Sequence, residues 1–303
     1  MGIGTPPAIA IERLTKRFGK LTAVNGLTIE VSGGQVVGFL GPNGAGKTTT
    51  IRTLMGFIRP TSGRVTILGG QPGQDTALRG RIGYLPGDFR MDPGMTGNDL
   101  FGWFGQLRGG LNRSRVRALT DRLQLDSSRP YRDLSKGNRQ KIGLVQAFMH
   151  DPQVLILDEP TTGLDPLIQR EFLELVREAA ARGAAVLFST HVLPEVERVA
   201  DAVAIIRAGR LIALSAVSDL LDHARHRLEF RFSAPITRSL FAGVPGVVEI
   251  DVSGQTATVA VDGAVDKVIR AALMGPSLIR VSSAGDELED LFISLYNPAQ
   301  EVL

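Results

Sequence analysis

The sequence has 303 residues, enough for about two domains, and its 43% hydrophobic and 21% charged residues are ordinary for a soluble globular protein. A formal net charge of +3 is too small to argue for nucleic-acid binding, and the lack of cysteine excludes disulfide bonds and thiol chemistry. Residues 1–10 lack the layout of a secretion signal, and no apolar run approaches the roughly 18 residues of a membrane span. If the protein acts at a membrane, we expect another chain to cross it.

Short apolar or alternating runs predict several strands in the first third of the chain. These runs are Ile9–Leu14, Leu27–Val31, Val36–Leu40, Arg64–Leu68 and Ile82–Pro86. A polar segment between the first two runs, residues 15–20, is expected to be a turn that contains one aromatic residue, Phe18. The Phe18 ring either stacks on a nucleobase or is simply half exposed in the turn.

Residues 98–150 differ in character, because their apolar residues recur at helical spacing and predict a mostly helical insertion. Leu100, Trp103, Phe104 and Leu107 form one stripe, which we expect to be core, with a groove for a partner as the alternative. The same segment is rich in arginine, which predicts a solvated helix face or, as the alternative, a docking surface. The residues concerned are Arg108, Arg113, Arg115, Arg117 and Arg122.

Further strands and helices follow the insertion. Val154–Leu157 and Ala184–Phe188 are expected to be buried strands, and Asp165-Pro166 predicts a capped helix start between them. Beyond about residue 215 we expect a separate small domain, residues 216–303, whose element order is βαββαβα and whose fold is ferredoxin-like. Its elements are expected at residues 226–233, 236–241, 247–253, 256–261, 265–274, 278–282 and 287–296.

The stretch Gly41–Thr48 reads Gly-Pro-Asn-Gly-Ala-Gly-Lys-Thr and fits the phosphate-loop pattern. A predicted strand precedes it and a predicted helix follows it, which is the context that the motif requires. Glycines allow backbone N–H groups to surround a polyphosphate, Lys47 can reach the terminal phosphates, and the Thr48 hydroxyl can bind Mg²⁺. The alternative is an ordinary glycine-rich turn between strand and helix.

Two more predicted strands end in polar residues. Asp158 and Glu159 follow one buried strand, and His191 follows another. Because ligands of open α/β sheets bind at the carboxyl ends of strands, Asp158 is suited to holding Mg²⁺ through water and Glu159 to orienting or deprotonating a water. His191 could sense a phosphate. The alternatives are an acid pair at a helix start and a structural histidine.

The stretch Leu134–Lys141, which reads Leu-Ser-Lys-Gly-Asn-Arg-Gln-Lys, resembles the signature of ABC transporter ATPases, whose usual form is Leu-Ser-Gly-Gly-Gln. The other family motifs occur in order: the loop at Gly41–Thr48 resembles Walker A, Val154–Glu159 resembles Walker B, and residues 163–165 resemble the D-loop. His191 matches the switch histidine, and Phe18 falls where the family has an adenine-stacking aromatic residue. The resemblance covers roughly residues 8 to 215.

The resemblance implies a fold class: α/β, a P-loop NTPase with a RecA-like core sheet, an antiparallel β subdomain and a helical subdomain. It also implies ATP and Mg²⁺ as cofactors and assigns roles to residues of this sequence. Catalytic roles fall to Glu159, His191 and Lys47. The residues expected to bind the nucleotide are Phe18, Gly41, Pro42, Asn43, Gly44, Ala45, Gly46, Lys47, Thr48 and Thr49. Those expected to bind Mg²⁺ are Thr48 and Asp158. The signature, acting on the partner's nucleotide, consists of Leu134, Ser135, Lys136, Gly137 and Asn138, and Asp165 belongs to the D-loop.

The resemblance further implies partners: a head-to-tail dimer of two copies, or of this chain with a related one, and a separate multi-span membrane permease. It implies that this chain is peripheral, at the cytoplasmic side of the cell membrane. The end of the chain, Leu288–Phe292, resembles the extra domain of drug-export ATPases of the daunorubicin-resistance type, which favours export. The signature departs from the family at Lys136 and Asn138. The Q-loop glutamine is replaced by Gly87, so that either Asp88 substitutes or the loop acts through its backbone.

Two other functions compete with a transporter subunit. The first is a soluble ABC-type ATPase that acts on ribosomes or DNA, but such relatives resemble tandem cassettes or contain a long coiled-coil insertion, and this chain has neither. The second is a regulator that binds ATP without cleaving it. The presence of Glu159 and His191 argues against that function, whereas Gly87 leaves it open. The sequence does not identify the transported compound.

Overall fold

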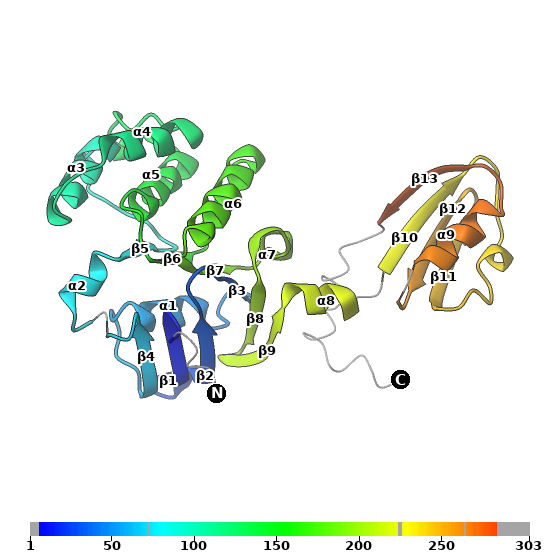
Figure 1. Ribbon diagram of the computed structural model, residues 1–303, viewed down its shortest axis with the longest axis horizontal. Coiled ribbons are helices and arrows are strands. Elements are labelled where there is room, and N and C mark those ends of the chain that lie inside the picture. The colour runs from blue at the N-terminus through cyan, green and yellow to red at the C-terminus, as the bar shows by residue number, and fades with distance from the viewer. Residues whose placement is uncertain (1–5, 72, 224–225, 264, 284–303) are drawn as a thin grey trace. The chain divides into compact units, whose positions relative to one another are not determined.

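The computed structural model describes residues 6–71, 73–223, 226–263 and 265–283. It divides into two compact units, Met1–Ser215 and Ala216–Leu303 (Figure 1). The helix predicted at residues 287–296 and the Leu288–Phe292 resemblance lie outside the described residues.

A six-stranded sheet forms the core of the first unit, in the order β5-β6-β7-β3-β8-β9. The pairs from β5 to β8 are parallel. Every residue of β3, β6 and β7 is buried, as expected for parallel strands that are covered on both faces. The strands are β3 (Val36–Leu40), β5 (Ile82–Leu85), β6 (Val154–Asp158), β7 (Ala185–Thr190), β8 (Ala202–Arg207) and β9 (Arg210–Ala216).

A second, antiparallel sheet has the order β2-β1-β4, with β1 (Ile9–Phe18), β2 (Leu21–Val31) and β4 (Ser62–Ile67). The turn predicted at residues 15–20 is shorter than expected, because β1 extends to Phe18, which pairs with Leu21, and only Gly19 and Lys20 form the turn. The pairing of β1 with β2 shifts register at several points between Ile11 and Arg17, as at β-bulges. Within this stretch Arg13 has a left-handed backbone conformation, with φ of 47°. Phe18 therefore stands at the end of a strand.

Figure 1 shows α3, α4 and α5 together on one side of the first unit, and these helices are the predicted helical insertion. The Asp165 side chain accepts hydrogen bonds from Leu167 N and Ile168 N and so caps α6 as predicted. The helices are α1 (Lys47–Leu54), α2 (Thr76–Arg79), α3 (Gly97–Leu107), α4 (Arg113–Arg122), the 3₁₀ turn η1 (Tyr131–Asp133), α5 (Lys136–Phe148), α6 (Pro166–Ala181) and α7 (Leu193–Val199).

The structure corrects two expectations for the helical insertion. Trp103 is 53% exposed and Leu107 is 64% exposed, so half of the predicted stripe is not core, whereas Leu100 of the stripe and the neighbouring Phe101 are buried. The arginines are not a uniformly solvated face either. Arg122 forms ion pairs with Glu171 and Glu178 of α6, and Arg115 pairs with Asp151 at 3.3 Å.

The second unit contains α8 (Val217–His223) and a four-stranded antiparallel sheet in the order β11-β12-β10-β13. In chain order this is strand 2-3-1-4, the arrangement of a ferredoxin-like βαββαβ unit, although its first helix is only the 3₁₀ turn η2 (Arg238–Leu240). Phe230, Phe232 and Phe241 are fully buried in a core of its own. The remaining elements are β10 (His226–Phe232), β11 (Val247–Ser253), β12 (Thr256–Val261), α9 (Asp266–Leu273) and β13 (Leu278–Ser283).

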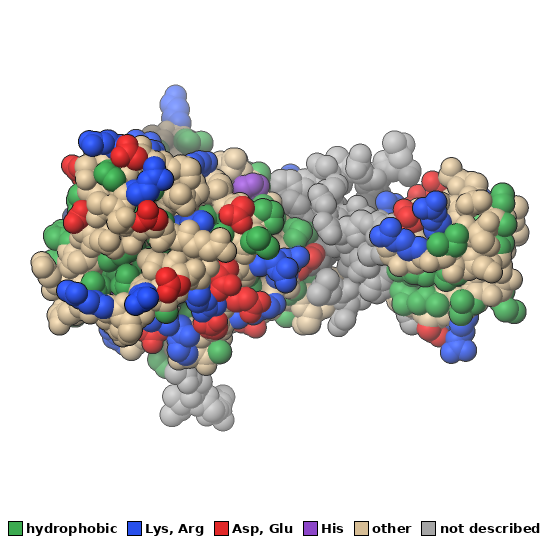
Figure 2. Space-filling view, turned by 90° about the horizontal axis from the view of Figure 1, so that it is seen from above, with side chains coloured by type: hydrophobic (Ala, Val, Ile, Leu, Met, Phe, Trp, Pro, Cys, Tyr) green, Lys and Arg blue, Asp and Glu red, His purple; other side chains and the backbone are tan. Residues whose placement is uncertain are grey.

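The surface of the first unit mixes charges of both signs. On the face shown in Figure 2, Lys and Arg side chains are interspersed with Asp and Glu, and hydrophobic side chains lie along the rim of the second unit. Exposed apolar residues of that unit include Leu273, Met274, Ile279 and Val281. None of the helices among the described residues is long and apolar enough to cross a membrane.

Candidate active site

The register of three parallel strands brings the predicted catalytic segments to one edge of the core sheet. Leu40 at the end of β3 pairs with Thr190 at the end of β7, and Asp158 at the end of β6 pairs with Ser189. The residues that follow these strands are Gly41, Glu159 and His191, so they emerge side by side. This edge is where an open α/β sheet binds ligands.

The loop between β3 and α1 wraps a cavity of about 540 Å³. Gly44 and Gly46 have φ of 82° and 110°, and a Cβ at Gly46 would lie 2.6 Å from Ala23 O, so only glycine fits there. The helix α1 begins at Lys47, directly after the loop, which points its free N–H groups at the cavity. Phe18, predicted to stack on the base, lines the same cavity, as do Pro42, Asn43, Gly44, Gly46, Lys47, Thr48, Thr49 and Glu159.

Three predicted catalytic side chains are in direct contact. Lys47 Nζ lies 3.1 Å from Glu159 Oε1, and His191 Nδ1 lies 2.8 Å from Glu159 Oε2. Lys47 also donates hydrogen bonds to Gly41 O and, at 3.2 Å, to Pro42 O. Glu159 has a left-handed φ of 48°, and its N–H donates to Ser189 O and Ser189 Oγ. Such a constrained backbone is typical of functional positions.

The predicted metal ligand Asp158 is 1% exposed. Its Oδ1 accepts a hydrogen bond from Ser189 Oγ at 2.6 Å, whereas Oδ2 is buried and has no hydrogen-bond partner among the described residues. An orphaned buried carboxylate oxygen fits a ligand position for a hard cation such as Mg²⁺. Burial and the charge of Asp158 also raise the pKa of Tyr84 on β5 to about 12, so that this phenol remains protonated.

The Q-loop region lies next to Asp158. A Cβ built on Gly87 would be 3.3 Å from Asp158 Oδ2, and its backbone takes no left-handed conformation. The Asp88 carboxylate is engaged elsewhere, because Arg90 Nη2 lies 2.7 Å from it and holds its pKa below the usual range. Of the two alternatives for this loop, the contacts therefore favour the backbone of Gly87 over the side chain of Asp88.

We expect Gly87→Gln to add an oxygen ligand beside Asp158 and so to lower the Mg²⁺ concentration that gives half-maximal ATPase activity, by about tenfold. Titrating Mg²⁺ at saturating ATP measures this change. Gly94→Gln, an exposed position of the same loop, is the matched control and should leave the Mg²⁺ dependence unchanged. A Gly87→Gln protein that folds and keeps the original dependence would contradict the placement of Gly87 at the metal.

The signature segment is separate from this cavity. Leu134 is buried, Ser135 caps α5 by accepting a hydrogen bond from Asn138 N at 3.2 Å, and none of the signature residues lines the cavity around the phosphate loop. A Cβ at Gly137 would lie 2.6 Å from Gly163 O, so the signature packs closely against the segment that leads to Asp165. The start of α5 is thus not part of the nucleotide cavity that the same chain forms.

Sequence reasoning missed several residues that support the site. Ser189 bridges Asp158 and Glu159, and Gln140 of α5 donates to Glu159 O and Pro160 O at 3.2 and 3.0 Å. Both contacts join segments that are far apart in the chain. The only available signal was local: Ser189 stands two residues before the predicted His191.

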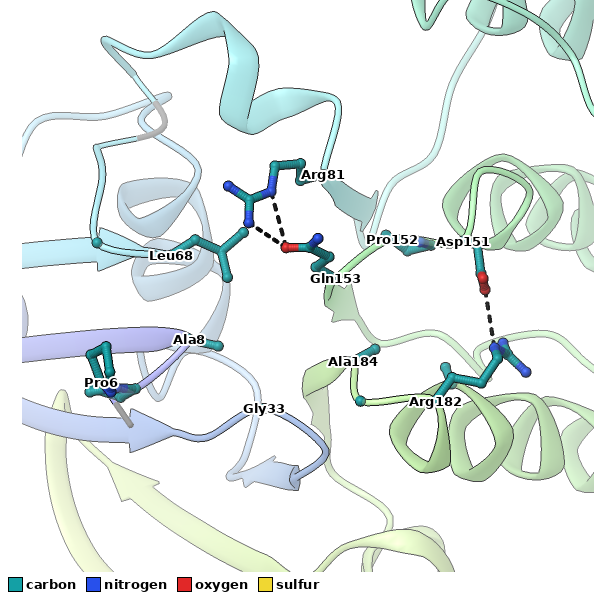
Figure 3. Close-up of a pocket in the computed structure, with 14 residues that line it drawn as sticks. Pro6, Ala8, Gly33, Leu68, Arg81, Asp151, Pro152, Gln153, Arg182 and Ala184 are labelled. Carbon is teal, nitrogen blue, oxygen red and sulfur yellow. Dashed lines mark hydrogen bonds and ion pairs between the residues drawn. The ribbon is translucent and has the colours of Figure 1, made fainter. Parts of the chain in front are cut away.

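The cleft drawn in Figure 3 lies at the opposite edge of the core sheet. Its lining includes Arg81, whose guanidinium bonds Gln153, and Arg182, which pairs with Asp151 at 3.1 Å. None of the predicted catalytic, nucleotide-binding or metal-binding residues lines this cleft. The candidate active site is therefore the cavity formed by the phosphate loop.

A glycine loop that leads from a buried strand into a helix, with a lysine, an acid pair and a histidine at the same sheet edge, defines a phosphate-loop nucleotide-binding protein. The family model described as "ABC transporter" matches residues 24–162. A protein of Ralstonia nicotianae, "Nod factor export ATP-binding protein I", is 39% identical over 228 residues, which cover 73% of this chain and 71% of that protein. The chain belongs to the ATP-binding proteins of ABC transporters, a family of ATPases.

Further similar proteins and solved structures are also ATP-binding proteins of ABC transporters. A protein of the same description from Rhizobium johnstonii is 32% identical over 299 residues, which cover 96% of this chain and 95% of that protein. A solved ATP-binding subunit of an ABC transporter matches with a TM-score of 0.65 and 30% identity, over 70% of this chain and 91% of its own. A bacterial ABC transporter cassette solved as a dimer matches with a TM-score of 0.63 and 21% identity, which supports the fold alone. The predicted fold class and ATPase family are thus confirmed.

Proposed function

We propose that this chain is the ATP-hydrolysing subunit of an exporter, a peripheral protein at the cytoplasmic side of a membrane that powers a separate permease. The observation that carries the proposal is the direct contact of Lys47, Glu159 and His191 beside the phosphate loop. Relatives across nearly the whole chain are described as Nod factor export proteins, which supports the direction of transport. The compound that is transported remains a property of the permease.

The contacts suggest how the residues divide the reaction. Lys47 releases Glu159 and turns to the β- and γ-phosphates, because a phosphate offers it a stronger, doubly charged acceptor. Glu159, freed at one oxygen and held at the other by His191, orients the attacking water and accepts its proton. Thr48 and the unpaired oxygen of Asp158 would hold Mg²⁺, which neutralises charge on the phosphates. Phe18 stacks on the base, and Thr49 and the loop N–H groups hold the phosphates.

We propose further that two cassettes form a head-to-tail dimer in which the signature of one faces the nucleotide of the other. The position of Ser135 and Gly137 outside the cavity of their own chain supports this arrangement. The N-terminal N–H groups of α5, together with Lys136, would then add positive charge at the γ-phosphate. ATP would hold the dimer closed, and its hydrolysis would remove the bridging group. Asp165, which caps α6, would stand at the dimer contact.

We expect Ser135→Ala, made in a Glu159→Gln chain to stop turnover, to bind ATP normally and to dimerise poorly. Loss of a hydrogen bond to a charged group costs about 1.5–3 kcal/mol at each site, or roughly 10- to 100-fold in affinity. Size-exclusion chromatography with MgATP measures the dimer. Asn112→Ala is the matched control, because Asn112 caps α4 as Ser135 caps α5 but contacts no predicted ATP site. Normal ATP-driven dimerisation of the Ser135 variant would remove the signature from this role.

A groove beside the helical insertion is where we propose that the permease docks. Its volume is about 950 Å³, and it lies between the end of α1, the loop after β5, and α3. Exposed Phe57 and Trp103 line it, an arrangement typical of protein contacts rather than of a free surface. Residues of the loop after β5 form one wall, from Phe89 to Met95, so movement at Gly87 in the same loop would be transmitted to this groove.

The test of the exporter proposal is the ATPase activity of the purified chain with and without the multi-span membrane protein encoded beside it. We expect that protein to bind the chain and to change its turnover. The absence of any neighbouring membrane protein that binds, together with binding to ribosomes or DNA, would favour the soluble alternative. A chain that binds ATP without turnover under both conditions would favour the regulator.

A further inference from the structure

We propose that Glu195, on α7, is a positioning residue that holds Glu159 and His191 in their reactive contact by binding both chain segments that carry them. The proposal rests on the roles given above to Glu159 and His191. Glu195 is 6% exposed and takes no part in the mechanism as described. A buried carboxylate that binds no substrate is costly, so its partners indicate what it does.

The first partner belongs to the histidine segment. Thr190, which directly precedes His191, is fully buried, and its hydroxyl donates to Glu195 Oε2 at 2.7 Å. The same hydroxyl oxygen accepts a hydrogen bond from Val192 N at 3.0 Å. Thr190 is thus bonded directly to the Glu195 carboxylate, and Val192 is linked to it through the Thr190 hydroxyl. A half-exposed histidine whose two neighbours are fixed has its backbone direction fixed as well.

The second partner belongs to the segment after Glu159. The hydroxyl of Thr161, which is also buried, lies close enough to the Glu195 carboxylate to lower the pKa of Glu195. Thr161 O accepts from Leu164 N at 3.0 Å, and Glu159 O accepts from Thr162 N at 3.3 Å, so the turn from Glu159 toward Asp165 is one hydrogen-bonded unit. Glu195 therefore joins this turn to the histidine segment.

The pKa of Glu195 depends on the same two threonine side chains. Burial raises its pKa, and the hydroxyls of Thr161 and Thr190 oppose that rise. If the Asp165 turn moves when a second cassette contacts it, Thr161 carries the movement to Glu195, and Thr190 carries it to His191. The bridge thus links the proposed dimer contact to the catalytic contact within one chain.

The experiment compares Glu195→Ala, Glu195→Gln and Thr161→Val with Arg198→Ala, an exposed control on the same helix. We expect kcat to fall about 30- to 100-fold in Glu195→Ala, because small misplacement of a reacting group costs up to about 10²-fold. Thr161→Val should lose about three- to tenfold, and Glu195→Gln, which keeps one acceptor, should retain more activity than Glu195→Ala. The affinity for ATP should change less than threefold in each, because none of these residues lines the nucleotide cavity.

A double variant, Glu195→Ala with Thr161→Val, decides whether the two residues act as one bridge. Its kcat should equal that of Glu195→Ala alone, since the Thr161 hydroxyl has then already lost its partner. The inference is overturned by a folded Glu195→Ala with kcat within twofold of wild type, or by additive losses in the double variant. If Glu195→Ala does not fold, Thr161→Val decides alone, and a wild-type kcat overturns the inference. Glu159→Gln serves as reference: if it also keeps full turnover, the proposed function has failed instead.

Discussion

Glu159→Gln is expected to lower ATP turnover by roughly 10²–10⁴-fold, the range for loss of a general base. The amide keeps the size of the side chain but cannot accept a proton at neutral pH. ATP binding should not weaken and should become tighter, because the neutral amide no longer competes with phosphate for Lys47, which lies 3.1 Å from the carboxylate. Phosphate release and equilibrium nucleotide binding measure the two effects separately.

A matched control for this variant is Glu174→Gln on α6, an exposed glutamate that pairs with Arg177 at 3.1 Å and does not line the nucleotide cavity. It changes the same charge at a distance from the site and should leave turnover within about twofold. A near-normal rate for Glu159→Gln would remove Glu159 from the role of base. Loss of ATP binding in that variant would instead show that its contact with Lys47 helps to form the site.

The parts of the site that follow from local sequence could be predicted. The phosphate loop is a contiguous motif, and the strands before Gly41 and Asp158 are short runs of apolar residues that can only be buried. Their parallel pairing then fixes where Glu159 and His191 emerge, and the structure brings both to Lys47. The start of α6 could also be predicted from adjacent residues, because Asp165 caps the helix and Pro166 is its first residue.

The parts that depend on partners distant in the sequence could not be predicted. Ser189 and Glu195 gain their contacts only when β6, β7 and α7 are packed, so no spacing rule points to them. Trp103 repeats at helical spacing as a core residue would, yet the neighbouring Phe101 is the one that the packing buries. A periodic pattern identifies a helix face, but it does not say which of two adjacent apolar faces meets the core.

Charges of opposite sign lie in contact at the phosphate loop. Lys47 is nearly buried, and its partners are Glu159 and two carbonyl oxygens of its own loop. Such an arrangement lowers the cost of burying the lysine cation. In the mechanism proposed above, phosphate would draw Lys47 away from Glu159 and so make this carboxylate available to water.

Lys47→Ala is expected to abolish measurable turnover and to weaken ATP binding by about 10- to 100-fold or more, since each lost charge-assisted hydrogen bond costs about 1.5–3 kcal/mol. The variant removes the cation at the phosphates and also leaves the buried Glu159 oxygen without its ion-pair partner. The double variant Lys47→Ala with Glu159→Gln separates these two effects. It should fold more stably than Lys47→Ala, because no unpaired carboxylate is buried, but it should recover no turnover, because the cation at the phosphates is still missing. Lys20→Ala, at an exposed lysine in the hairpin turn after Phe18, is the control. Fluorescent-nucleotide titration and thermal unfolding measure both effects, and unchanged kinetics in Lys47→Ala would contradict the phosphate-loop assignment.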